Sequence, residues 1–150
     1  MFDLLYTVII LEYQMEFDTF VNSKSYSEDN KPVESECYFF RNLHREHSEK
    51  VLKNRVCGNF LIRVAIDIPD KSVKYILSLV VKNIFFHFFV RGVKTDINTE
   101  KYAIGHKKQN EKLFSSLQEL IRYYSLHKLR CSKQFIDFEL VLIPINSDKT

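Results

Sequence analysis

The stretch GNFLIRVAI, residues 58–66, decides the fold of this chain. Gly58 ends the polar segment before it, and the β-branched and aromatic residues that follow predict a buried β-strand over 59–66. Arg63 is the exception in this strand, because a guanidinium is costly to bury unless an anion accepts its hydrogen bonds. A lone strand arginine is more often a surface residue or half of an ion pair, so its neighbours along the chain must decide its role.

Hydrophobic spacing on both sides of this strand predicts further elements. Upstream, a short amphipathic helix is expected over 44–53. Downstream, a polar loop at 67–72 leads into two apolar runs, 73–81 and 84–91, and the two residues between the runs predict a tight antiparallel hairpin. Alternation in the second run places Phe86, Phe88 and Val90 on one face and Phe85, His87 and Phe89 on the other.

The C-terminal half predicts one more helix and two short strands. Apolar residues recur at helical spacing from Leu117 to about Ser125, and the hydroxyl of Ser115 or Ser116 can cap this helix. Short strands are expected at 102–104 and at 138–142. The order predicts an α+β fold, with a central antiparallel sheet flanked by two helices and no repeated strand–helix crossover.

Charge divides the chain unevenly. Of 150 residues, 45% are hydrophobic, which suits one domain with its own core. Residues 1–36 carry eight acids and two lysines, a net charge of −6, which leaves +9 on the remainder because the total is +3. We therefore expect an acidic extension at 1–36, a domain at 37–145 and a tail at 146–150. A basic domain favours an anionic partner without identifying it.

The remaining features exclude several classes of function. Three cysteines without CxxC spacing predict no metal site and a reduced, cytoplasmic protein. The apolar run at 4–11 is far shorter than the roughly 20 residues of a membrane helix, so no membrane insertion is expected. There is no phosphate-binding glycine motif and no nucleophile elbow, so we expect no cofactor and no catalytic residues. Phenylalanines in strands fit a core better than a nucleic-acid stacking platform.

A series of blocks surrounding Arg63 resembles the Src homology 2 domain family in order and spacing, over residues 38 to about 145. The blocks are YFF at 38–40, REHSE at 45–49, GNFLIR at 58–63, YILSL at 75–79, His87, YAIG at 102–105 and FSSLQELI at 114–121. The closing FELVLIP, 138–144, shows a weaker resemblance to the domains of phosphoinositide 3-kinase regulatory subunits.

This resemblance implies a phosphotyrosine pocket. The arginine that matches Arg63 holds two phosphate oxygens with its fork, and the one that matches Arg45 contacts the phosphate and the phosphotyrosine ring. His87 matches a histidine that shapes the pocket, and Lys71 and Ser72 lie in the loop that corresponds to the phosphate-binding loop. Phe88, Phe89 and Ile104 are the candidates for peptide specificity.

Some positions depart from the family pattern. Tyr38 stands where tryptophan is common, Ala65 replaces a frequent phosphate-contacting serine, and Phe89 replaces a frequent lysine. Loss of a hydroxyl and a cation could weaken phosphate binding by about a few kcal/mol unless another group compensates.

The function predicted from the sequence is that of a non-catalytic adaptor or regulatory module, whose partner is a tyrosine-phosphorylated receptor or scaffold protein. Two alternatives stay open. The chain could be a phosphate-independent interaction module with a decayed pocket, or a fragment of a signalling enzyme such as a tyrosine kinase or phosphatase. The retention of both Arg63 and Arg45 argues against a decayed pocket.

Overall fold

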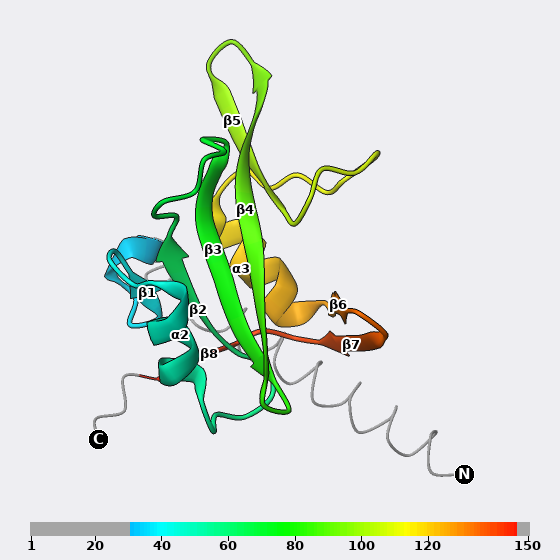
Figure 1. Ribbon diagram of the computed structural model, residues 1–150. Coiled ribbons are helices and arrows are strands. Elements are labelled where there is room, and N and C mark those ends of the chain that lie inside the picture. Colours follow the sequence, from blue (N-terminus) through cyan, green and yellow to red (C-terminus); the bar gives the residue numbers. More distant parts are fainter. Residues whose placement is uncertain (1–30, 147–150) are drawn as a thin grey trace, which may run out of the picture. The chain divides into compact units, whose positions relative to one another are not determined.

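The strand that contains Arg63 lies within a mostly antiparallel central sheet. In the computed structural model, which describes residues 31–146, this strand is β2 (Asn59–Val64). It is followed across the sheet by β3 (Val73–Val81), β4 (Ile84–Asp96) and β5 (Thr99–Ile104), each antiparallel to its neighbour. Two short strands, β1 (Phe39–Phe40) and β8 (Ile143–Pro144), run parallel to β2 (Figure 1).

The predicted hairpin between β3 and β4 is confirmed. Val81 pairs with Ile84, which leaves Lys82 and Asn83 as a two-residue turn. Both turn residues have positive φ, 48° and 63°, as the tight turns that match strand twist require.

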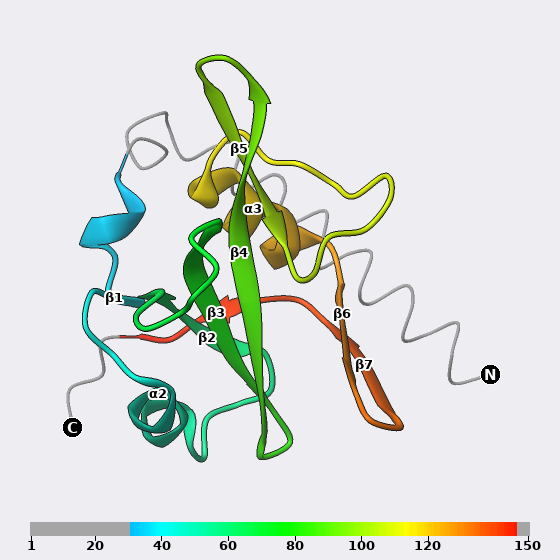
Figure 2. The same ribbon diagram turned by 45° about the horizontal axis from the view of Figure 1, so that its top comes forward.

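Strand β4 continues beyond the predicted 84–91, and with β5 it forms a hairpin that extends past the end of β3 (Figures 1 and 2). Here Val93 pairs with Lys101 and Lys94 with Glu100. These side chains are mostly charged, which is why the hydrophobic pattern predicted a strand only as far as residue 91. The hairpin continues because backbone hydrogen bonds between strands do not require apolar side chains.

The two predicted helices are α2 (Arg45–Leu52) and α3 (Leu117–Leu126), and a 3-10 turn, η1 (Val33–Ser35), precedes β1. Ser116 caps α3, because its hydroxyl accepts a hydrogen bond from the backbone N–H of Glu119. The Glu119 carboxylate in turn accepts one from the backbone N–H of Ser115. This reciprocal capping box explains why the helix begins at Leu117.

The two helices cover opposite faces of the sheet, as two separate core clusters show. Helix α3 packs with β2, β3 and β4 through Leu117, Leu120, Ile121, Phe60, Ile62, Leu77, Leu79 and Phe86. Helix α2 packs on the other face through Leu52, Leu61, Val80 and Ile145. Because successive residues of a strand point to opposite faces, adjacent Leu61 and Ile62 enter different clusters. The predicted α+β class is confirmed.

The closing segment differs from its prediction. Instead of one strand over 138–142, β7 (Ile136–Leu140) pairs with β6 (Leu129–Lys133) in a separate two-stranded sheet. The backbone N–H of Leu142 donates to Tyr124 O at the end of α3, which diverts the chain before β8 joins the central sheet. Strand β2 also ends two residues early, at Val64, ahead of the positive φ of Asp67.

The apolar run at 4–11, nearly all of the acidic extension and residues 147–150 of the tail lie outside the described residues. Val33 is 6% exposed and belongs to the α3-side core, so packing begins before the predicted boundary at residue 36, which stays a prediction. Between residues 31 and 146, no helix is long and apolar enough to cross a membrane. Cys37, Cys57 and Cys131 are free thiols.

Candidate functional site

Strand register places Arg63 among polar side chains of β3 and β4. Arg63 pairs with Ile76 and then Phe89, and the neighbouring row runs from Leu61 to Ser78 to His87. Residues directly opposite in antiparallel strands share a face, so these two rows lie on the face that α2 covers. We call this surface of β2, β3 and β4 the α2 face.

A chain of hydrogen bonds fixes the Arg63 guanidinium. Arg63 Nε donates to Ser78 Oγ over 3.1 Å, and Ser78 Oγ lies 2.8 Å from His87 Nδ1. Arg63 Nη2 lies 3.5 Å from the same ring nitrogen. Because a guanidinium only donates, His87 Nδ1 must act as the acceptor, and the ring proton of neutral His87 belongs on Nε2.

Helix α2 completes this chain. His87 Nε2 donates to Glu49 Oε1 over 2.8 Å, and Arg45 Nε lies 3.5 Å from the same oxygen. The four-residue spacing of Arg45 and Glu49 puts both on one side of the helix, and Glu49 reaches the sheet at His87. The structure therefore joins Arg63, His87 and Arg45, three of the predicted site residues, through Ser78 and Glu49.

The electrostatics of the site favour an anion. Burial is the main cause that lowers the pKa of Arg63, repulsion from Arg45 lowers it further, and Glu49 offsets part of the effect. Arginine keeps its charge in proteins despite such shifts. Arg63 is only 5% exposed, its partner Ser78 carries no charge, and burial lowers the pKa of its partner His87, which favours the neutral ring. The guanidinium thus holds a buried positive charge that a phosphate could match.

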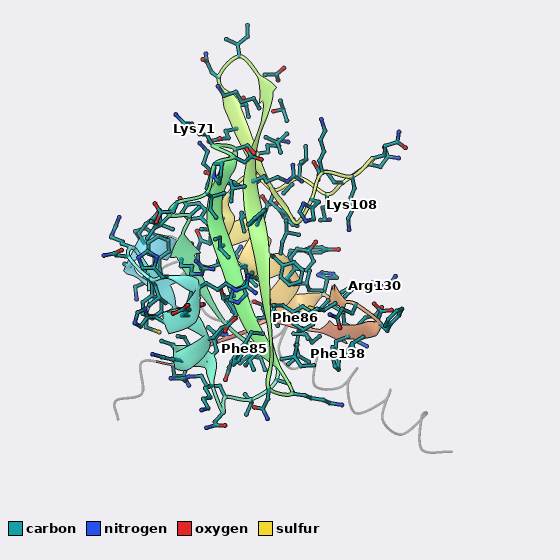
Figure 3. All side chains as sticks on the ribbon, in the orientation of Figure 1. Lys71, Phe85, Phe86, Lys108, Arg130 and Phe138 are labelled. Atoms are coloured by element: carbon teal, nitrogen blue, oxygen red, sulfur yellow. The ribbon has the colours of Figure 1, made fainter. Side chains whose placement is uncertain are left out.

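The loop residues Lys71 and Ser72 are placed differently. The backbone N–H and the hydroxyl of Ser72 both donate to Asp70 Oδ1, over 2.9 Å and 2.7 Å. These bonds also lower the pKa of Asp70. Lys71 is exposed in the loop that precedes β3, at the end of the sheet far from Phe85 (Figure 3). In this structure the Ser72 hydroxyl is committed to its own loop, so a role in phosphate binding stays a prediction.

The three specificity candidates divide between the two faces. Phe88 stacks on Phe86, with ring centroids 6.2 Å apart, and packs with Ile104 against the α3-side core. Phe89 lies in the Arg63 row on the α2 face, where its ring meets His106 edge-on at 6.0 Å. Phe88 and Ile104 thus lie on the face that α3 covers, and the side chain of Phe89 lies on the opposite face.

Ser78 and Glu49 are the site residues that sequence reasoning missed. Ser78 is fully buried within the apolar run 76–81 of β3, and a lone hydroxyl in such a run is a signal that a polar group needs a partner. Glu49 carries no comparable signal, because charged residues are ordinary on a helix. In the part of the chain that is described, no group of His, Cys, Asp and Glu is arranged to hold a metal ion.

A sheet held between two helices, with a buried arginine facing a second arginine on α2, defines a small α+β binding domain. The family model of the SH2 (Src homology 2) domain matches residues 38–124, more than half of the chain. The chain therefore belongs to the SH2 domain family, a class of non-catalytic modules in phosphotyrosine signalling.

The solved structure of a distant relative agrees on the fold. The solution structure of the SH2 domain of a CRK/CRKL homologue from Monosiga brevicollis matches with a TM-score of 0.54 and 20% identity, over 80% of this chain and 95% of that one. The VAV1 SH2 domain, complexed with a tyrosine-phosphorylated peptide from SLP76, matches with a TM-score of 0.47 and 20% identity, over 64% of this chain and 61% of that one. No curated protein shows significant similarity.

Proposed function

We propose that this SH2 domain is a cytoplasmic adaptor or regulatory module that binds tyrosine-phosphorylated receptor or scaffold proteins. Arg63 holds the phosphate from the sheet, and Arg45 contacts it from α2. His87 keeps Arg63 in place through Ser78. Phe88 and Ile104, on the other face, select residues that follow the phosphotyrosine.

The observation that carries this proposal is the burial and the hydrogen bonding of the Arg63 guanidinium. Its guanidinium is buried, and the hydrogen bonds that fix it lead to uncharged groups. A buried cation is tolerated when an anion of matching geometry binds to it, and a phosphate dianion accepts paired hydrogen bonds from a guanidinium. A carboxylate is present nearby on Glu49, but it bonds His87 and not Arg63.

A second function is favoured by Ala65 and Phe89. Neither residue can donate a hydrogen bond from its side chain to phosphate, and both stand where the family pattern has a polar group. A module that binds its partner without regard to phosphate would fit these changes. The intact bonding of Arg63 supports the phosphate-binding function over this alternative.

The test is a titration of the domain with a degenerate phosphotyrosine peptide pool and with its unphosphorylated twin, followed by fluorescence anisotropy. The same titrations are made with Arg63→Ala, which should weaken phosphate-dependent binding by roughly 2 to 5 kcal/mol because it removes the buried partner of the phosphate. Arg130→Ala is the matched control, since that arginine lies on β6 with its side chain 71% exposed.

Phosphate-dependent binding that is lost in Arg63→Ala and kept in Arg130→Ala supports the proposal. Equal affinity for the phosphorylated and unphosphorylated pools would establish the phosphate-independent module instead. Circular dichroism of each variant checks that the loss does not come from unfolding.

A further inference from the structure

Glu49 places a carboxylate inside the positively charged side of the site. Its Oε1 atom lies 2.8 Å from His87 Nε2 and 3.5 Å from Arg45 Nε. The Glu49 side chain is 33% exposed, so it borders both the buried row of the sheet and the solvent. An anion that touches one of the two arginines stands next to the place that a phosphate would occupy.

This carboxylate is ionised at neutral pH. The hydrogen bond from His87 is the main cause that lowers the pKa of Glu49, and Arg45 lowers it further. Glu49 also acts on Arg63, because its negative charge offsets part of the repulsion between the two arginines. One carboxylate therefore interacts with both cations of the site in the absence of ligand.

We propose that Glu49 is an internal anion of the phosphotyrosine site, which pairs with Arg45 in the free domain and lowers the affinity of the site for phosphate. This inference rests on the proposed function. The incoming dianion meets two arginines and one carboxylate, so it gains less than from the arginines alone. It must also compete with Glu49 for Arg45.

The composition of the α2 face makes this competition important. Phe89 and Ala65 supply neither a cation nor a hydroxyl, so few groups offset the negative charge of Glu49. The Arg45 side chain is 65% exposed and its contact with the Glu49 carboxylate is long, at 3.5 Å, so a turn toward a phosphate would break a weak contact. The charge of Glu49 thus acts directly on the affinity.

The variant Glu49→Gln separates this charge from its hydrogen bonds. A glutamine keeps an oxygen that can accept from His87 and from Arg45 but carries no charge. Removal of one negative charge beside a phosphate dianion should tighten phosphotyrosine peptide binding about tenfold at low salt. The difference in affinity between Glu49→Gln and the wild type should narrow as ionic strength rises, because salt screens the repulsion between Glu49 and the phosphate.

Glu46→Gln is the matched control. Glu46 lies one turn earlier on the same helix and is exposed, so this change alters the net charge equally without touching His87. Wild type and both variants are titrated with the phosphotyrosine peptide pool and its unphosphorylated twin, at low and high salt.

A selective, salt-sensitive gain in Glu49→Gln, including a gain from undetectable binding in the wild type, supports the inference. Unchanged or weaker binding in Glu49→Gln, while binding still depends on phosphate and Arg63, overturns the inference and leaves the proposed function intact. A gain of the same size in Glu46→Gln, or one that persists at high salt, also overturns it. Absence of phosphate-dependent binding in all three proteins overturns the proposed function, and the inference with it.

Discussion

A single imidazole connects the sheet arginine to helix α2. His87 Nδ1 accepts from Ser78 while Nε2 donates to Glu49, so both ring nitrogens are used in the neutral form. A second proton on the ring would have to displace the hydrogen bond from Ser78. The protonation state of His87 therefore determines whether the chain of bonds behind Arg63 is complete.

The stability of the domain should fall in mild acid because of His87. Burial is the main cause that lowers the pKa of His87 below its usual value of 6.5; Arg45 and Arg63 lower it too, and Glu49 partly opposes them. As pH falls below 6.5, the unfolded chain binds a proton that the folded chain resists, so the free energy of unfolding decreases. Below 4.5, protonation of Glu49, whose pKa is also lowered, continues the loss.

Chemical denaturation at a series of pH values checks this prediction. His87→Gln should give a flatter dependence of the unfolding free energy between about pH 7 and 5 than the wild type, because it removes the titrating group. His47→Gln, at an exposed position of α2, is the control for the loss of a histidine side chain. Identical slopes in all three proteins would contradict the role of His87.

At the scale of single residues, the sequence reveals the charged residue Arg63 better than it reveals the hydrogen-bond partners of that residue. Arg63 is conspicuous because it interrupts an apolar strand, and alternation already puts His87 and Phe89 on one face of β4. The bond through Ser78 could have been predicted, because a two-residue turn at Lys82 and Asn83 places Ser78 opposite His87. The bond through Glu49 depends on how α2 is rotated against the sheet, and the local pattern of the helix does not reveal that rotation.

At the level of elements, Gly58 lies in the connection between α2 and β2 and lets the segment before β8 approach closely. Its φ is +93°, in the left-handed region, and its backbone oxygen accepts a hydrogen bond from Ile143 N. A Cβ at this position would lie 2.7 Å from the backbone oxygen of Val141. The close approach of the segment before β8 thus depends on the absence of a side chain.

Gly58→Ala should lower the free energy of unfolding by about 2 kcal/mol or more, since it adds a backbone clash to left-handed strain. Gly105→Ala is the matched control, because φ is +80° there but a Cβ would meet no atom within 4 Å. Urea unfolding of both variants measures the difference, which isolates the clash. Equal losses would show that the segment before β8 can move away from Gly58.

Elements of the sheet were predictable where hydrophobic pattern and turn residues agree, as in the hairpin at Lys82 and Asn83. The end of the chain was not. Val141 and Leu142 follow the alternation of β7, yet the bond between Leu142 N and Tyr124 O takes them out of the strand. This hydrogen bond joins a residue after β7 to a residue of α3 that is far from it in the sequence, so the local hydrophobic pattern cannot reveal it.

For the domain as a whole, the central sheet separates the residues proposed for two tasks, phosphate binding and peptide selection. Arg63, Ser78 and His87 lie on the α2 face, whereas Phe88 and Ile104 pack on the α3 side. Strand alternation alone produces this separation, because adjacent residues such as His87 and Phe88 point to opposite faces. A peptide that crosses the edge of the sheet could then present its phosphate to one face and the residues that follow to the other.

The separation predicts that the two tasks are energetically independent. Arg45→Ala should weaken binding by loss of a phosphate contact, and Ile104→Ala by loss of an apolar contact with the peptide. Since these side chains lie on opposite sides of the sheet, and Arg45 contacts Glu49 whereas Ile104 packs against the α3-side core, their effects on the binding free energy should add to within about 0.5 kcal/mol. Isothermal titration of one selected phosphotyrosine peptide with the wild type, both single variants and the double variant measures the coupling.

A second cycle, between Arg45→Ala and Glu49→Gln, shows what coupling looks like in the same domain. These residues are in contact, with Arg45 Nε 3.5 Å from Glu49 Oε1, so their effects should deviate from additivity. If the binding free energies of the pair on opposite faces deviate from additivity as much as those of the pair in contact, the sheet does not separate the two sets of residues energetically. Phosphate anchorage and peptide selection would then be one linked surface, and Phe89, on the α2 face, would be the first residue to examine as the link.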